Sequence, residues 1–142
     1  MTENCVFCQI IRRQVPASVI YQDDRVIAFL SNRPVNVGHT LVVPRKHYAN
    51  VFEVPEDEIA YLARVVKRMA QAVKDAVGAE GIRIVQNNGE AAGQVVFHFH
   101  MHVIPMKPSN QHGHDNVFRD PTHFREADAL EQDAVKIRQN LN

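Results

Sequence analysis

The chain has 142 residues, 45% of them hydrophobic, and its 16 basic and 16 acidic side chains give a formal net charge of zero. This length fits one domain with a substantial core, and a neutral chain gives no indication of a polyanion-binding surface. No apolar run is long enough to span a bilayer, and the N-terminus lacks the features of a secretory signal. We therefore expect a single cytoplasmic domain over residues 1–142 that binds neither nucleic acid nor membranes.

Cys5 and Cys8 are the two cysteines of the chain and form a C-x-x-C pair. In a reducing compartment this spacing indicates a metal site, a redox pair or chance. A thioredoxin-like role would want a preceding strand and a βαβ pattern, which the first ten residues do not offer. The segment 5–13 predicts a short helical turn with Ile10 and Ile11 packed inward.

Three short strands are predicted next from their apolar character and the turn residues between them: 19–22, 25–30 and 39–43. The first two are joined at Asp23-Asp24, whose composition favours a tight hairpin. In the third, Leu41 and Val43 share one face, and Pro44 ends the strand.

Pro55 opens the clearest helical pattern of the chain. Proline suits the first helical position, and the acidic residues 56–58 suit the positive end of the helix. Apolar residues then recur at spacings of three and four up to Gly78, a natural C-cap. Strands are predicted at 82–86 and 95–104, joined by a glycine-containing loop at 87–94. This order predicts an α+β fold, an antiparallel sheet with a helix on one face.

Three histidines alternate with apolar residues in the last predicted strand. Because strand side chains alternate between faces, His98, His100 and His102 should share one face. They could be structural histidines that satisfy one another with hydrogen bonds. They could bind one metal, although outer Cα atoms about 13 Å apart strain tridentate binding. They could instead act on a phosphate, one neutral imidazole attacking phosphorus while its neighbours donate hydrogen bonds. We favour the third interpretation.

The segment H-F-H-M-H-V-I at 98–104 resembles the signature of the histidine-triad (HIT) family of nucleotide hydrolases and transferases. G-H-T-L-V-V-P at 38–44, N-N-G at 87–89 and A-G-Q at 92–94 agree with it, so the likeness covers about 5–105. The resemblance implies a five-stranded antiparallel sheet with one long helix on a face, a short N-terminal helical turn and a C-terminal helix. It also implies a homodimer that continues the sheet across the two-fold axis.

The resemblance implies roles for individual residues. His100 would be the nucleophile, and His39 would support it or contact the leaving group. Donors to the phosphoryl oxygens would come from His102, Gln94, Asn87 and the backbone around Gly93. Two positions depart from the family pattern: Ser31, with Asn32 beside it, stands where many relatives bind the ribose with Asp or Asn, and Val95 stands where some phosphoramidases carry Ser. The base pocket is expected from Ile27, Phe29 and Leu30.

The resemblance also implies a structural Zn²⁺. Some relatives complete a Cys₂His₂ site with two histidines, which match His47 and His98 here and join Cys5 and Cys8. Four ligands leave no open position, so such a zinc would be structural, and the chemistry would require no catalytic metal. The alternative is that both thiols are free and His98 only orients its neighbours.

We expect a hydrolase or transferase acting on the α-phosphate of purine nucleoside 5′-phosphate derivatives, of the AMP-phosphoramidate or AMP-ester type, through a nucleotidyl-histidine. A dinucleoside polyphosphate hydrolase is the near alternative. A nucleotide- and zinc-binding regulatory module with little turnover is the alternative of another class.

The tail lies outside the likeness. Residues 106–125 are expected to be irregular, and a second metal site at His112, His114 and His123 is a weaker alternative to a solvated loop. From about Glu126 a last helix is expected, with an apolar stripe at Leu130, Ala134, Ile137 and Leu141. It would lie against a dimer partner or cap the leaving-group side of the substrate.

Overall fold

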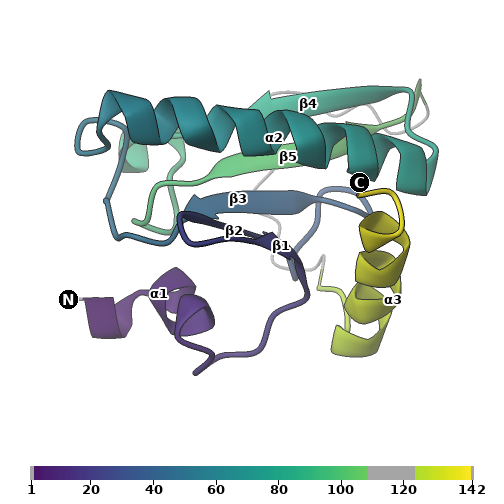
Figure 1. The fold of residues 1–142 in the computed structure, drawn as a ribbon, viewed down its shortest axis with the longest axis horizontal. Coiled ribbons are helices and arrows are strands. Elements are labelled where there is room, and N and C mark those ends of the chain that lie inside the picture. The colour runs from purple at the N-terminus through teal and green to yellow at the C-terminus, as the bar shows by residue number, and fades with distance from the viewer. Residues whose placement is uncertain (1, 109–123, 142) are drawn as a thin grey trace.

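The computed structural model describes residues 2–108 and 124–141, and the expected HIT-like α+β architecture is confirmed (Figure 1). The five strands form one antiparallel sheet in the order β1-β2-β3-β5-β4. The helices and strands are α1 (Val6–Ile11), β1 (Val19–Gln22), β2 (Val26–Leu30), β3 (Thr40–Pro44), α2 (Glu56–Val77), β4 (Gly81–Val85), β5 (Met101–Met106) and α3 (Ala127–Arg138), with 3-10 turns at Thr2–Asn4 and Glu90–Ala92. The three loop histidines of the proposed second metal site lie outside the described residues.

The central strands are covered on both faces. Every residue of β2 and β3 is buried, which explains their nearly continuous apolar sequences. Val42 faces a core cluster shared with α2 and α3, whereas Leu41 and Val43 face a second cluster built with α1. Figure 1 shows α2 running along the sheet, with α1 at the lower left of the view and α3 at the right. The predicted alternation of β3 is therefore confirmed.

Helix α2 is the scaffold of the larger cluster, and it begins one residue later than predicted. Pro55 is its N-cap, with ψ of 147°, and its carbonyl accepts the first helical hydrogen bonds from Glu58 and Ile59. A proline lacks the backbone N–H, but neither the N-cap nor the first helical position needs that N–H for a helical hydrogen bond. The sequence therefore could not distinguish the two positions for Pro55. Gly78 ends the helix with φ of 67°, the left-handed conformation expected of a glycine C-cap.

Asp23 shapes the hairpin between β1 and β2. Its Oδ1 accepts from the backbone N–H groups of Arg25 and Val26 at 2.8 Å, and its Oδ2 accepts from the hydroxyls of Tyr21 and Tyr61. Burial raises the pKa of Asp23, but these hydrogen bonds outweigh it and lower the pKa to about 2. Since Tyr61 belongs to α2, one carboxylate fixes the turn and ties it to the long helix.

Strand β5 begins at Met101, so the prediction of a strand from residue 95 is wrong. It pairs with β3 through Thr40↔Val103 and Val42↔Met101, and continuing this register would place Phe99 opposite Pro44. The carbonyl of Pro44 instead accepts from the His98 imidazole at 2.8 Å, and the N–H of Phe99 donates to Tyr48 O at 2.7 Å. The ladder stops because a side chain has taken its acceptor.

Helix α3 follows the predicted apolar stripe, since Leu130, Ala134 and Ile137 are buried. It packs on β1 and on α2 of its own chain. Among the described residues, no helix combines the length and apolar character needed to cross a membrane.

Candidate active site and metal centre

A pocket of about 710 Å³ opens beside the histidines. Its walls come from α1, the end of β2, the loop before β5 and the first turns of α3. Its lining includes His39, His100 and His102, together with Ser31, Asn32, Asn87, Gly93 and Gln94. The structure thus brings most of the sequence-predicted site residues to one cavity.

The tautomer of His100 follows from its partner. Its Nδ1 lies 2.6 Å from the backbone oxygen of His98, and because a carbonyl only accepts, Nδ1 carries the proton. Nε2 is left with a lone pair. Burial lowers the pKa of His100 below its ordinary value, which keeps the ring neutral at pH 7. A neutral imidazole with one nitrogen held and the other unprotonated has the state that a nucleophile requires.

His39 and His102 form a relay of fixed polarity. The backbone N–H of Val35 donates to His39 Nδ1 at 3.0 Å, so the proton of His39 resides on Nε2, which lies 3.0 Å from Nδ1 of His102. His102 must accept there and therefore carries its own proton on Nε2. Burial first, and then repulsion from neighbouring imidazoles, lowers the pKa of His39 to about 3 and that of His102 to about 2. The centroid of the His102 ring lies 4.8 Å from that of the His100 ring, so the two neutral imidazoles are direct neighbours.

Gln94 holds the loop together. Its Oε1 accepts from Gly89 N at 2.7 Å, and its Nε2 donates to the carbonyls of Ala49 at 2.6 Å and Val96 at 3.1 Å. Both amide protons are thereby used, and the residue is 4% exposed. This arrangement does not offer the phosphoryl donor that the resemblance implies for Gln94.

Asn87 and Gly93 face the pocket more openly. Within the described part of the chain, no hydrogen bond engages the Asn87 side chain, which leaves an amide available to a ligand. Gly93 has φ of 90°, a conformation that disfavours side chains, and it caps the short turn Glu90–Ala92.

The end of β2 lines the pocket, but not through every residue expected. The hydroxyl of Ser31 accepts from Arg33 N at 3.2 Å, and Asn32 is exposed with its carbonyl accepting from Arg125 N at 2.9 Å. Phe29 and Leu30 reach the pocket. Ile27 does not belong to its lining and packs in the α1 cluster, because its position in β2 is too far from the open end.

Sequence reasoning missed two parts of the pocket wall. Phe7, between the two cysteines, contacts His100 edge-on with ring centroids 5.0 Å apart at 88°. Its place between Cys5 and Cys8 was the available signal. Phe124 and Arg125 come from the tail, where no motif marks them. Arg125 is held by a bidentate pair with Asp133 at 2.7 and 3.0 Å.

The two cysteines converge with two histidines. The donor atoms of Cys5, Cys8, His47 and His98 all lie within 4.8 Å of one another. Nδ1 of His98 is 3.3 Å from Cys5 Sγ and 3.5 Å from Cys8 Sγ, and Nδ1 of His47 is 3.4 Å from Cys8 Sγ. A tetrahedral ion with Zn–S of about 2.3 Å and Zn–N of about 2.0 Å has S···N edges of about 3.5 Å. The spacing therefore fits one tetrahedral metal ion.

The protonation of the cluster agrees with this fit. His98 donates from Nε2 to Pro44 O, which leaves its Nδ1 unprotonated and aimed at the sulfurs. Burial, together with Cys5, raises the pKa of Cys8 to about 11, so the thiolate forms only if a cation stabilises it. The residues suit a structural site with no position open to substrate.

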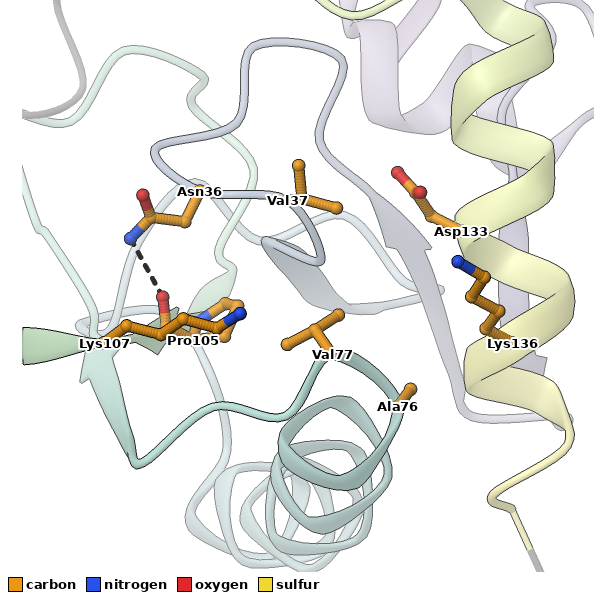
Figure 2. Close-up of a pocket in the computed structure, with 8 residues that line it drawn as sticks. All are labelled: Asn36, Val37, Ala76, Val77, Pro105, Lys107, Asp133 and Lys136. Atoms are coloured by element: carbon orange, nitrogen blue, oxygen red, sulfur yellow. Dashed lines mark hydrogen bonds between the residues drawn. The ribbon is translucent and has the colours of Figure 1, made fainter. Parts of the chain in front are cut away.

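A second pocket, of about 420 Å³, lies between the C-terminal end of α2, α3 and the turn before β3 (Figure 2). Asn36 crosses to this region and donates to the carbonyl of Pro105 at 2.9 Å. Lys107 and Lys136 at its rim are exposed, and Asp133 is already paired with Arg125. No histidine of the described part of the chain lines this pocket.

Comparison with known proteins gives the class of this fold and site. The HIT domain model matches residues 12–109. An uncharacterized HIT-like protein of Saccharolobus solfataricus is 50% identical over 101 residues, which are 71% of this chain and 73% of that protein. The adenylylsulfatase HINT3 of Arabidopsis thaliana is 38% identical over 107 residues, 75% of this chain and 54% of that protein.

Solved structures of histidine-triad proteins share the fold of this chain. A Hit-like protein involved in cell-cycle regulation from Bartonella henselae superposes with a TM-score of 0.87 at 34% identity, covering 98% of both chains. A Zn-bound histidine triad family protein from Mycobacterium smegmatis gives a TM-score of 0.80 at 33% identity, covering 99% of this chain and 94% of that one. The fold and the histidine cluster are those of histidine-triad proteins. The chain belongs to the HIT family.

Proposed function

We propose that this protein hydrolyses or transfers the nucleotidyl group of purine nucleoside 5′-phosphate derivatives, of the AMP-phosphoramidate or AMP-ester type, through a covalent intermediate on His100. The observation that carries the proposal is the 2.6 Å hydrogen bond from His100 Nδ1 to the backbone oxygen of His98. It leaves Nε2 unprotonated beside a pocket large enough for a nucleotide.

In the first step Nε2 of His100 forms a bond to the α-phosphorus, and the bond from phosphorus to the leaving nitrogen or oxygen breaks. The Nε2–H of His102 hydrogen-bonds the departing atom or a phosphoryl oxygen as charge develops there, and His39 fixes its direction. The departing group leaves with the electron pair of the broken bond and takes up a proton. Water then attacks the phosphorus and gives up one proton, the bond from phosphorus to Nε2 breaks with its electron pair returning to His100, and the nucleoside monophosphate leaves, so the net reaction consumes one water. None of these steps requires a catalytic metal.

The charges around the pocket favour a small leaving group. Among the described residues, the arginines that line the pocket are Arg33 and Arg125, and Arg125 is already neutralised by Asp133. Asp128 and Glu131 add negative charge to the same wall. A dinucleoside polyphosphate would bring several more negative charges into this region than the described lining residues can match with cations. The relative named as an adenylylsulfatase also supports an adenylate with a small leaving group. A dinucleoside polyphosphate hydrolase remains the second candidate.

We propose Zn²⁺ for the cluster of Cys5, Cys8, His47 and His98. The tetrahedral spacing of the donor atoms and the Zn-bound relative from Mycobacterium smegmatis support it. When bound, the ion would hold α1 and the loop after β3 against His98. Elemental analysis of the purified protein should find one zinc per chain, and His47→Ala should lower that content.

We also propose a homodimer joined along β4. Among the described residues this strand has a neighbour on one side only, and Ile84 on it is 50% exposed. At the opposite edge strand, β1, α3 is in contact with the strand and Arg138 donates to Val19 O at 3.0 Å. Light scattering should give twice the chain mass, and Ile84→Lys should shift it towards the monomer.

Substrate assays test the function directly. We expect turnover of AMP-phosphoramidate well above that of diadenosine tri- or tetraphosphate, and loss of at least about 10³-fold in kcat for His100→Ala. A protein that binds AMP and zinc but turns over no activated nucleotide would instead be the regulatory module. Full activity of His100→Ala would end the assignment of the nucleophile.

A further inference from the structure

The metal cluster and the nucleophile share one residue. Nδ1 of His98 lies 3.3 Å from Cys5 Sγ, and the backbone oxygen of His98 accepts the proton of His100 Nδ1 at 2.6 Å. His98 is fully buried, and its remaining ring nitrogen donates to Pro44 O. The contacts that hold the His98 ring, to Cys5 Sγ and to Pro44 O, therefore also hold the His98 backbone carbonyl, which sets the tautomer of His100.

Phe7 is a second link between the two sites. It lies between the cluster cysteines on α1, is 5% exposed, and touches the rings of both His100 and His98 edge-on, at 5.0 and 5.9 Å. Helix α1 has six residues, too few to be stable by itself. Its place against the sheet, and with it the place of Phe7, depends on its apolar packing against Leu41 and Val43 and on how Cys5 and Cys8 are held.

We propose that the centre formed by Cys5, Cys8, His47 and His98 positions the nucleophile, with Phe7 and His98 as positioning residues. An unrestrained neutral imidazole exchanges between two tautomers, and only the Nδ1–H form of His100 presents its Nε2 lone pair. A loaded centre selects that form by fixing the His98 carbonyl on one side and the Phe7 ring on the other. This inference rests on the proposed zinc and nucleophile, and it adds that losing the metal impairs catalysis before it unfolds the domain.

Three variants separate positioning from simple tethering. His47→Ala removes a metal ligand that lies outside the pocket lining and whose ring packs on His98 rather than on the nucleophile. Phe7→Leu keeps all four ligands and an apolar side chain but removes the ring edge. Ile11→Ala is the matched control, because Ile11 lies on α1 like Phe7, packs against the same apolar cluster and does not line the pocket.

The readouts are zinc content, the nitrogen-15 chemical shifts of the His100 ring, and kcat and KM for AMP-phosphoramidate. We expect one Nδ1–H tautomer in the wild type and in Ile11→Ala. In His47→Ala and Phe7→Leu we expect a mixture of tautomers and a kcat about 10- to 100-fold lower, the size typical of a misplaced reacting group. KM for His47→Ala should stay within about threefold of the wild type, because the change leaves the pocket lining intact.

A folded, zinc-depleted His47→Ala protein with unchanged His100 signals and kcat would overturn the inference, as would wild-type protein that binds no zinc. Should His47→Ala fail to fold, Phe7→Leu decides by the same signals. A wild type that turns over no adenylate would refute the proposed function alone, since the tautomer of His100 is measured without turnover.

Discussion

Two buried imidazoles should make the stability of this protein fall in mild acid. His39 and His102 are 1% and 9% exposed, and their pKa values are lowered to about 3 and about 2, mainly by burial. Both are neutral in the folded chain above these values, whereas in the unfolded chain they take up protons near pH 6.5. The unfolded state therefore binds more protons below pH 6.5, and the stability present above that pH is lost as the pH falls.

The magnitude follows from the linkage relation. Each imidazole lowers the free energy of unfolding by up to 1.4 kcal/mol per pH unit below about 6.5, so between pH 6.5 and 4.5 each contributes about 2 kcal/mol and the pair about 4. This loss is a large fraction of the stability of a typical domain.

Urea unfolding of the wild type and of the double variant His39→Gln, His102→Gln, at half-unit steps from pH 7.5 to 4.5, measures the effect. The metal centre and all other ionisable groups are the same in both proteins, so the difference between the two curves isolates the pair. We expect the wild type to lose about 4 kcal/mol more than the variant between pH 6.5 and 4.5. Parallel curves would show that the two imidazoles are not held neutral, and the relay described above would be refuted.

Three further predictions concern the scaffold and the metal. Gln94→Ala should lower the free energy of unfolding by about 2 kcal/mol, because three buried hydrogen bonds are lost. The control Gln71→Ala removes an exposed hydrogen bond to Asp75 and should change the free energy of unfolding by less than about 0.5 kcal/mol. Equal effects of the two substitutions in urea unfolding would contradict this prediction. Asp23→Asn should cost about 1–2 kcal/mol at pH 7. Because the pKa of Asp23 is lowered to about 2, the difference from wild type should shrink as the pH falls from about 4 towards 2, and a constant difference would refute the role of its charge. Chelation of the metal should lower the melting temperature in wild type but not in Cys5→Ala, Cys8→Ala protein, as scanning calorimetry can show.

The sequence predicted the scaffold well where local patterns decide the structure. The stripe of α2, the glycine at its end and the Asp23 turn are each encoded within a few residues, and they form as expected. The apolar alternation of β3 also sufficed to assign its two faces.

The misses have a common physical origin, because each depends on a partner distant in sequence. Strand β5 starts late because His98 takes the carbonyl of Pro44. Gln94 is occupied by the loop at Ala49, and Ile27 packs under α1 rather than in the pocket. Arg125 reaches the pocket through a hydrogen bond to Asn32 and an ion pair with Asp133, neither of which a single sequence reveals.

Mass analysis of the reacting protein tests the nucleophile most directly. Wild-type protein is mixed with an activated adenylate, quenched in alkali within the first turnover, digested and mapped. We predict one AMP adduct on the peptide that contains His100, and none in His100→Ala. Finding the adduct on another residue, or undiminished in the variant, would contradict the account of this site.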